Sequence, residues 1–140
     1  MQAPAREQAS DNQNKGNTVA MKPSIWLGED GIVRIRFPDN FHLSLGAVQG
    51  LNHSHRELST ERRPVLVHAD SVASADYEAQ RFASDPLVTE VVSAMAIIVR
   101  SVFTRALADL FMKFHRPPYP TRVFTSENEA LDWLRRGARD

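Results

Sequence analysis

The stretch HADSVASADYEAQRF, residues 68 to 82, gathers many of the side chains in this sequence that could do chemistry. It directly follows a short apolar run, so an imidazole, carboxylates, hydroxyls and a phenol come together at the end of a predicted strand. Open α/β sheets bind their ligands just beyond the carboxyl ends of their strands. The candidates for a ligand or partner loop are therefore His68, Asp70, Ser71, Ser74, Asp76 and Tyr77.

The same residues also have a structural explanation. Short polar side chains are common at turns because their oxygen atoms accept hydrogen bonds from the free backbone N–H groups of a helix start. Asp70, Ser71, Ser74 and Asp76 fit this role. The stretch is interpreted mainly as a polar turn that caps a helix, with ligand or partner binding as the alternative.

Other signatures of catalysis or metal binding are missing from the sequence, so we predict no enzyme, no cofactor and no metal site. It contains no Gly-x-Ser-x-Gly, no His-Glu-x-x-His and no Gly-rich phosphate loop. His53 and His55 would point roughly 200° apart on a helix, which prevents chelation of one ion. The chain has no cysteine, which excludes disulfides and thiolate chemistry.

Alternating and continuous apolar runs predict the strands that would position the stretch. SIWLGEDGIVRIRF is typical of a β-hairpin, with Ile25 and Leu27 facing inward on the first strand and Val33 and Ile35 on the second. The triplet 65–67, bounded by a proline, suits a central strand covered on both faces. SAMAIIVR and TRVFTS predict two further strands.

Helical spacing and capping residues predict the helices between these strands. Ser44 and Ser101 precede long helical patterns, Asp85-Pro86 starts a short one, and Ser126 opens a capping box. The predicted fold is α/β: an N-terminal β-hairpin, then alternating helices and strands that form a mixed, largely parallel sheet of about five strands with covering helices.

Composition indicates one domain behind a tail. The chain has 140 residues, of which 42% are hydrophobic, enough for one compact core. Residues 1–20 are rich in Gln, Asn, Ala and Ser and are predicted to be a flexible tail, whereas residues 21–140 form the domain.

Charge and hydropathy indicate which partners and which cellular location to expect for the domain. Seventeen basic and seventeen acidic residues balance, which argues against nucleic-acid binding. The longest apolar run is far shorter than the ~20 residues that cross a membrane, and no signal-peptide pattern is present. We therefore expect a cytoplasmic protein that does not insert into membranes.

Residues 24 to 136 resemble the STAS superfamily of anti-sigma-factor antagonists, in particular small bacterial proteins described as SpoIIAA-like. The resemblance lies in GEDGIVRIRF, in RRPVLVHADSVASADYEAQRF and in RALADLFMKFHRPPYPTRVFTSENEALDWL. It implies a STAS-like fold and binding to a protein partner. In signalling members an Asp-Ser-Ser-Gly-like turn carries a phosphorylated serine. Here Asp76 matches the aspartate, and Tyr77, Glu78 and Ala79 occupy the next positions, so the acceptor serine is missing.

The predicted function is that of a non-catalytic, cytoplasmic regulatory or scaffold module that acts through protein contacts. The alternative is a carrier or sensor of a small apolar ligand or lipid, held in a pocket between helices and sheet by analogy with lipid-binding CRAL-TRIO folds. The helix expected over residues 102–115 is more apolar than a one-sided cover needs. Core packing against the sheet is the main interpretation, with a ligand pocket or a self-association face as the alternatives.

The surplus of apolar residues also predicts a homodimer. Trp26 alternates with Ile25 and Leu27 and should therefore point away from the core. Phe114 and Tyr119, with the prolines between them, would form a second rigid patch at the end of the long helix. Aromatic residues are favoured interface anchors because they bury a large area at a small entropic cost.

Deletion of residues 1–20 should leave the thermal midpoint of unfolding nearly unchanged, because this composition cannot bury enough apolar area to add stability. Differential scanning fluorimetry of the full and shortened chains tests the expectation. A drop of many degrees would show that the segment packs on the domain.

Overall fold

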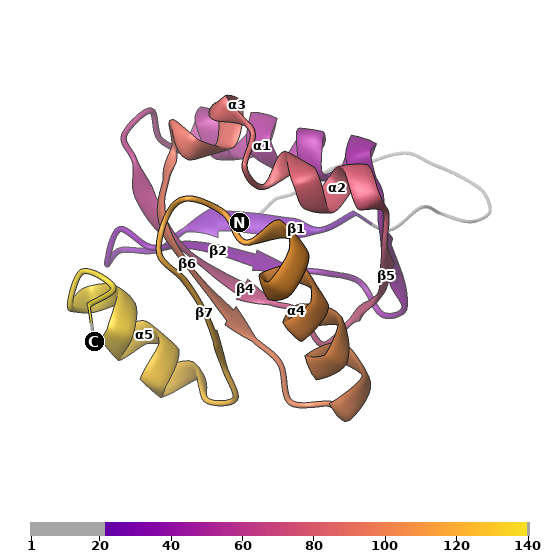
Figure 1. Cartoon of the computed structure of the whole chain (residues 1–140). Coiled ribbons are helices and arrows are strands. Elements are labelled where there is room, and N and C mark those ends of the chain that lie inside the picture. Colours follow the sequence, from indigo (N-terminus) through magenta and orange to yellow (C-terminus); the bar gives the residue numbers. More distant parts are fainter. Residues whose placement is uncertain (1–21, 140) are drawn as a thin grey trace.

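A five-stranded sheet with helices on both faces forms the centre of the molecule (Figure 1). The structure is a computed structural model that describes residues 22–139; the predicted tail, residues 1–20, lies outside the described residues. The strands are β1 (Ser24–Leu27), β2 (Val33–Arg36), β4 (Arg63–His68), β6 (Val92–Ile98) and β7 (Thr121–Phe124), in the spatial order β1-β2-β4-β6-β7. The first pair is antiparallel and the others are parallel. The predicted fold class is confirmed.

The hairpin between β1 and β2 closes on a glycine and an aspartate. Gly31 has a φ of +82°, a conformation that favours glycine. Asp30 accepts hydrogen bonds from the Arg34 guanidinium, at 2.9 and 3.0 Å, and from Arg135 at 3.1 Å. These bonds to Arg34 and Arg135 help to hold the pKa of Asp30 well below its usual range. One carboxylate therefore connects the turn to the C-terminal helix.

A second, two-stranded sheet was not expected from the sequence. It pairs β3 (Phe41–Leu43) in parallel with β5 (Val72–Ala75). Ser74 therefore belongs to a strand, whereas the sequence placed it in a capping turn. The sequence pattern for these two strands is weak, because each strand is very short and VASA carries only one large apolar side chain. Pairing with a distant partner fixes this structure.

The helices in residues 22–139 are α1 (Leu45–Leu58), α2 (Tyr77–Phe82), α3 (Pro86–Thr89), α4 (Val102–His115) and α5 (Glu127–Arg135). The predicted caps of α1, α3, α4 and α5 are confirmed: the side chains of Ser44, Asp85, Ser101 and Ser126 each accept a backbone N–H. Asp76 precedes α2 but makes no such bond, so its predicted capping role is not observed.

The two faces of the sheet have different covers (Figure 1). Leu66 of β4 points to the α5 face, where it joins Ala96 and Ile98 of β6 and Trp133 and Leu134 of α5. Its neighbours in β4, Val65 and Val67, point to the opposite face, which α1 and the segments from α2 to α4 cover. The prediction of a central strand buried on both faces is therefore confirmed.

Tyr119 differs from its expected role as an interface residue. Its side chain is 3% exposed and packs in the core beside Val88 and Val91. Its hydroxyl donates a hydrogen bond of 2.9 Å to the backbone carbonyl of Ala83. The proline-rich loop after α4 folds this ring inward, so Tyr119 cannot offer surface to a partner.

Leu66→Ala should lower the free energy of unfolding by about 3 kcal/mol, because it opens a cavity at a fully buried position of β4. Urea denaturation measures the change. Leu87→Ala, at an exposed leucine of α3, is the matched control and should cost less than about 1 kcal/mol. Equal losses in the two variants would contradict the central position of β4.

Candidate functional site

The six predicted loop residues occupy several separate places. His68 lies on the α5 side of the sheet, where its Nε2 is 3.2 Å from Glu127 Oε1. The distance would suit an ion pair, but burial, followed by the Arg36 guanidinium, lowers the pKa of His68 despite Glu127. At neutral pH the ring is therefore uncharged, and its contact with Glu127 is that of a neutral imidazole beside a carboxylate. His68 thus connects the end of β4 with the start of α5, and it does not face the other residues of the 68–82 stretch.

Asp70 holds the segment that leads into α4. Its Oδ1 accepts hydrogen bonds from the backbone N–H groups of Arg100, at 2.8 Å, and of Ser101, at 3.1 Å. The backbone carbonyl of the same aspartate accepts from the Thr104 hydroxyl at 3.3 Å. Asp70 thus supports a turn, as predicted, but the turn belongs to the next crossover. Ser71 makes a longer contact, 3.4 Å, with Asp39.

Ser74 and Asp76 meet a residue that the sequence did not single out. His42 Nδ1 lies 2.6 Å from Ser74 Oγ, and His42 Nε2 lies 3.0 Å from Asp76 Oδ1. A carboxylate can only accept, so Nε2 donates; in a neutral ring Nδ1 then accepts the hydroxyl proton of Ser74. The three side chains form one chain of hydrogen bonds across β3 and β5.

This chain of bonds polarises the Ser74 hydroxyl, as in serine nucleophiles that are activated by a histidine. The side chains of His42 and Asp76 are exposed to water, however, whereas catalytic trios of this kind work in water-excluded sites. The arrangement stabilises the pairing of β3 with β5. No local signal in the sequence could reveal it, because His42 lies far from Ser74 along the chain.

Tyr77 marks the place where α2 meets α4. Its ring packs edge-on against His115 at the end of α4, with ring centroids 4.9 Å apart. The guanidinium of Arg81 lies 5.9 Å from the centre of the same ring. Tyr77 remains exposed, so it extends the surface of α4 toward the start of α2.

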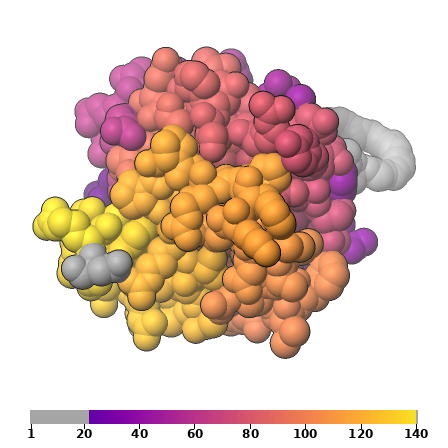
Figure 2. Space-filling model, viewed as in Figure 1, coloured from indigo at the N-terminus to yellow at the C-terminus, as the bar shows by residue number. Residues whose placement is uncertain are grey.

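One face of α4 carries apolar side chains that other described residues leave uncovered. Phe103, Leu110 and Phe114 are 62%, 51% and 64% exposed, and the half-buried Leu107 lies between them on the same side of the helix. We call these four residues the α4 stripe. Figure 2, viewed as Figure 1, shows α4 at the near surface of the molecule. Monomeric proteins rarely expose large contiguous apolar patches, so the α4 stripe is a candidate contact surface.

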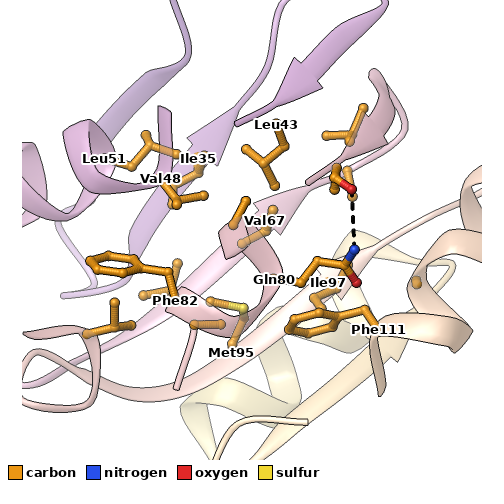
Figure 3. Close-up of a pocket in the computed structure, with 18 of the residues that line it drawn as sticks. Ile35, Leu43, Val48, Leu51, Val67, Gln80, Phe82, Met95, Ile97 and Phe111 are labelled. Atoms are coloured by element: carbon orange, nitrogen blue, oxygen red, sulfur yellow. Dashed lines mark hydrogen bonds between the residues drawn. The ribbon is translucent and has the colours of Figure 1, made fainter. Parts of the chain in front are cut away.

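A cavity of about 260 Å³ lies between α4, α2, α1 and the sheet. Figure 3 shows Leu51, Phe82, Met95 and Phe111 around this space, one each from α1, α2, β6 and α4. It remains open because many side chains of its wall are small, including Ala69, Ala75, Ala79, Ala83 and Ala108. This is the pocket between helices and sheet that the alternative function requires.

Two further properties concern residues 22–139. This part of the chain contains no group of three or more histidine, aspartate and glutamate side chains arranged to hold a metal ion. None of its helices is both long and apolar enough to cross a membrane.

Asp70→Ala should lower the free energy of unfolding by about 1 to 2 kcal/mol, because the N–H groups of Arg100 and Ser101 lose their acceptor. Asp39→Ala is the matched control, since it removes only the long contact to Ser71, and should cost less than about 0.5 kcal/mol. Urea denaturation compares them. An Asp70→Ala variant as stable as wild type would remove the structural explanation of this residue.

Solved structures similar to this one share its architecture. One is an uncharacterised protein of the DUF3478 family with a SpoIIAA-like fold from Shewanella loihica PV-4, 13% identical over 85% of this chain and 99% of that chain, with a TM-score of 0.58. Another is the anti-sigma factor antagonist SpoIIAA in its unphosphorylated form, 14% identical over 81% and 97%, with a TM-score of 0.51. At these identities the likeness concerns the fold, and it confirms the predicted STAS-like architecture.

The sequence matches no curated protein. It does match, over residues 25–137, a family described as a domain of unknown function, DUF7793. The match covers all the described helices and, apart from Ser24, the hairpin and the main sheet. The chain therefore belongs to the DUF7793 family.

Proposed function

We propose that this protein is a non-catalytic regulatory module of the cytoplasm that acts through protein contacts, and that its first contact is a second copy of the same chain. The observation that carries the proposal is the α4 stripe. Its phenylalanines are exposed although burial of one aromatic side chain stabilises a protein or an interface substantially. A partner that covers them would recover this energy.

The order of residues in the stripe favours a two-fold partner. Phe103, Leu107, Leu110 and Phe114 are separated by four, three and four positions, so both the spacing and the residue types read the same in either direction. In an isologous interface, residue i contacts residue j and j contacts i. Two antiparallel copies of α4 would thus place Phe103 against Phe114 at both ends and Leu107 against Leu110 between them.

The fold supports a regulatory role by analogy. A structure with the same architecture is that of an anti-sigma factor antagonist in its unphosphorylated form. In this chain Tyr77 occupies the position where the resemblance places the acceptor serine, and the nearby Ser74 forms a hydrogen bond with His42. The proposed regulation therefore depends on contact surfaces and does not require a serine phosphoswitch.

A second candidate function is to carry or sense a small apolar ligand, and the cavity beneath α4 favours it. Its volume is close to the lower end of ligand pockets, about 300 Å³, and apolar side chains form most of its wall. Leu107 and Leu110 line the cavity and also belong to the α4 stripe. A ligand below α4 and a partner on its outer face would therefore share one helix.

Light scattering at micromolar concentration should give wild type twice the chain mass, and Phe103→Glu or Phe114→Lys should each give a monomer. Each substitution places a charge against an aromatic ring at both ends of the two-fold contact. The double variant Phe103→Glu/Phe114→Lys should recover the dimer, because each introduced carboxylate then faces an ammonium group.

Two controls make this test specific. Phe103→Lys/Phe114→Lys changes the same positions but opposes like charges, so it should remain monomeric. Trp26→Ala tests the other predicted interface residue, whose side chain is 38% exposed on β1, and should leave the dimer intact if α4 is the contact. A monomeric wild type, or a dimer that survives every change in α4, would overturn the proposal.

A further inference from the structure

The centre of the sheet is less completely buried on the α4 face than on the α5 face. Leu66 of β4 and Ala96 of β6 point to α5, and both are 0% exposed. Their neighbours in the same strands, Val67 and Met95, line the cavity and are only half-buried (Figure 3). Apolar side chains in the middle of a parallel sheet are normally covered on both faces. A molecule in the cavity would complete the burial of Val67 and Met95.

α4 packs less closely on the sheet than α5 does, and the cavity lies beneath it. Two of the 14 residues of α4 are buried, Thr104 and Ala108, whereas four of the nine residues of α5 are buried. Ala108 of α4 and Ala79 of α2 line the cavity and are 8% and 3% exposed. A methyl group is all that either side chain adds to the wall, so these two alanines leave room for a ligand.

The polar groups of the cavity wall offer little to a polar ligand. Four of its polar side chains already donate hydrogen bonds to backbone carbonyls: Asn52, Gln80, Thr104 and Tyr119. His55 also belongs to the wall, but its unpaired Nε2 is itself buried and is therefore closed to a ligand. Among residues 22–139, no lysine, arginine, aspartate or glutamate lines the cavity. A polar or charged ligand would lose its hydration without replacing it, so a hydrocarbon is favoured.

The volume of the cavity limits the size of the ligand. A cavity of about 150 Å³ lined by apolar side chains binds benzene, so in proportion about 260 Å³ suits a molecule of about ten non-hydrogen atoms. Water is a poor competitor for this space, because a buried water molecule needs roughly two to four polar partners. The described wall is largely hydrocarbon, as Figure 3 shows, and does not supply them.

We propose that the cavity binds a hydrocarbon of about ten carbon atoms, recognised by its volume and without a hydrogen bond, and that Ala79 and Ala108 set the upper limit of its size. The inference rests on the second candidate function and adds the chemical class of the ligand and the residues that determine specificity. Affinity comes from the apolar area removed from water. Selectivity comes from the space that the two alanines leave.

Naphthalene and quinoline test the chemical class, because they have nearly the same bicyclic shape and only quinoline has a ring nitrogen that accepts hydrogen bonds. NMR titration of the full chain should show that wild type binds naphthalene at least about fivefold more tightly, since the quinoline nitrogen loses its hydration without gaining a donor. The methyl signals of Val67 and Met95 should shift, and those of Leu66, on the opposite face of the sheet, should not.

Benzene tests the size limit. Wild type should bind naphthalene at least about tenfold more tightly than benzene, because the larger ring system buries more apolar area. Ala108→Leu adds an isopropyl group to the wall, so this variant should lose naphthalene binding and retain benzene binding. Ala79→Leu should have the same effect from α2. Ala106→Leu, the same change at an exposed position of α4, is the matched control and should bind both probes as wild type does.

The possible outcomes separate the inference from the function on which it rests. If none of the three probes shifts the signals of Val67 and Met95, both the inference and the second candidate function are overturned. If quinoline binds as tightly as naphthalene, the cavity binds ligands but the hydrocarbon class is rejected. If both leucine variants still prefer naphthalene, the two alanines do not limit the size of the ligand. Should a leucine variant fail to fold, the smaller change Ala108→Val takes its place, and the ratios in wild type still decide the chemical class.

Discussion

Burial of β4 on both faces is the constraint on which the rest of this structure depends. Val65 and Val67 point to one side of the sheet and Leu66 to the other, and all three need apolar neighbours. Parallel neighbours on both edges require crossover connections, and the helices in those connections supply the two covers. The layered arrangement follows from three consecutive apolar residues in one strand.

The helices on the two faces of the sheet pack against it to different extents. This difference connects the two candidate functions, partner contact and ligand binding. Trp133 and Leu134 of α5 close one face with large side chains. On the other face, Ala79 of α2 and Ala108 of α4 are too small to reach across to the sheet, so a cavity remains beneath α4. The leucines of α4 contribute to this cavity and to the exposed α4 stripe. The cavity and the exposed stripe therefore share one helix.

Polar residues at the carboxyl edge of the sheet mainly organise the chain. Asp70 holds the start of α4, His68 holds the start of α5, and His42 joins the two strands of the small sheet. The contacts of Asp70 and His42 fix the ends of elements that surround the cavity, whereas the contact of His68 fixes the helix that covers the opposite face. The polar side chains of residues 68–82 therefore mainly stabilise the fold. The two candidate functional features, the α4 stripe and the cavity, lie on and beneath α4.

The sequence by itself determined the elements whose signals are local. Alternation around a Gly/Asp turn predicted the hairpin, a continuous apolar triplet predicted the central strand, and serines predicted the starts of α1, α4 and α5. Only the tertiary structure decided the pairing of β3 with β5, the meeting of His42 with Ser74 and Asp76, the inward turn of Tyr119 and the free nitrogen of His55. The physical reason is sequence separation: a cap or a turn is specified within a few residues, whereas burial and hydrogen-bond partners depend on which distant segments the fold brings together.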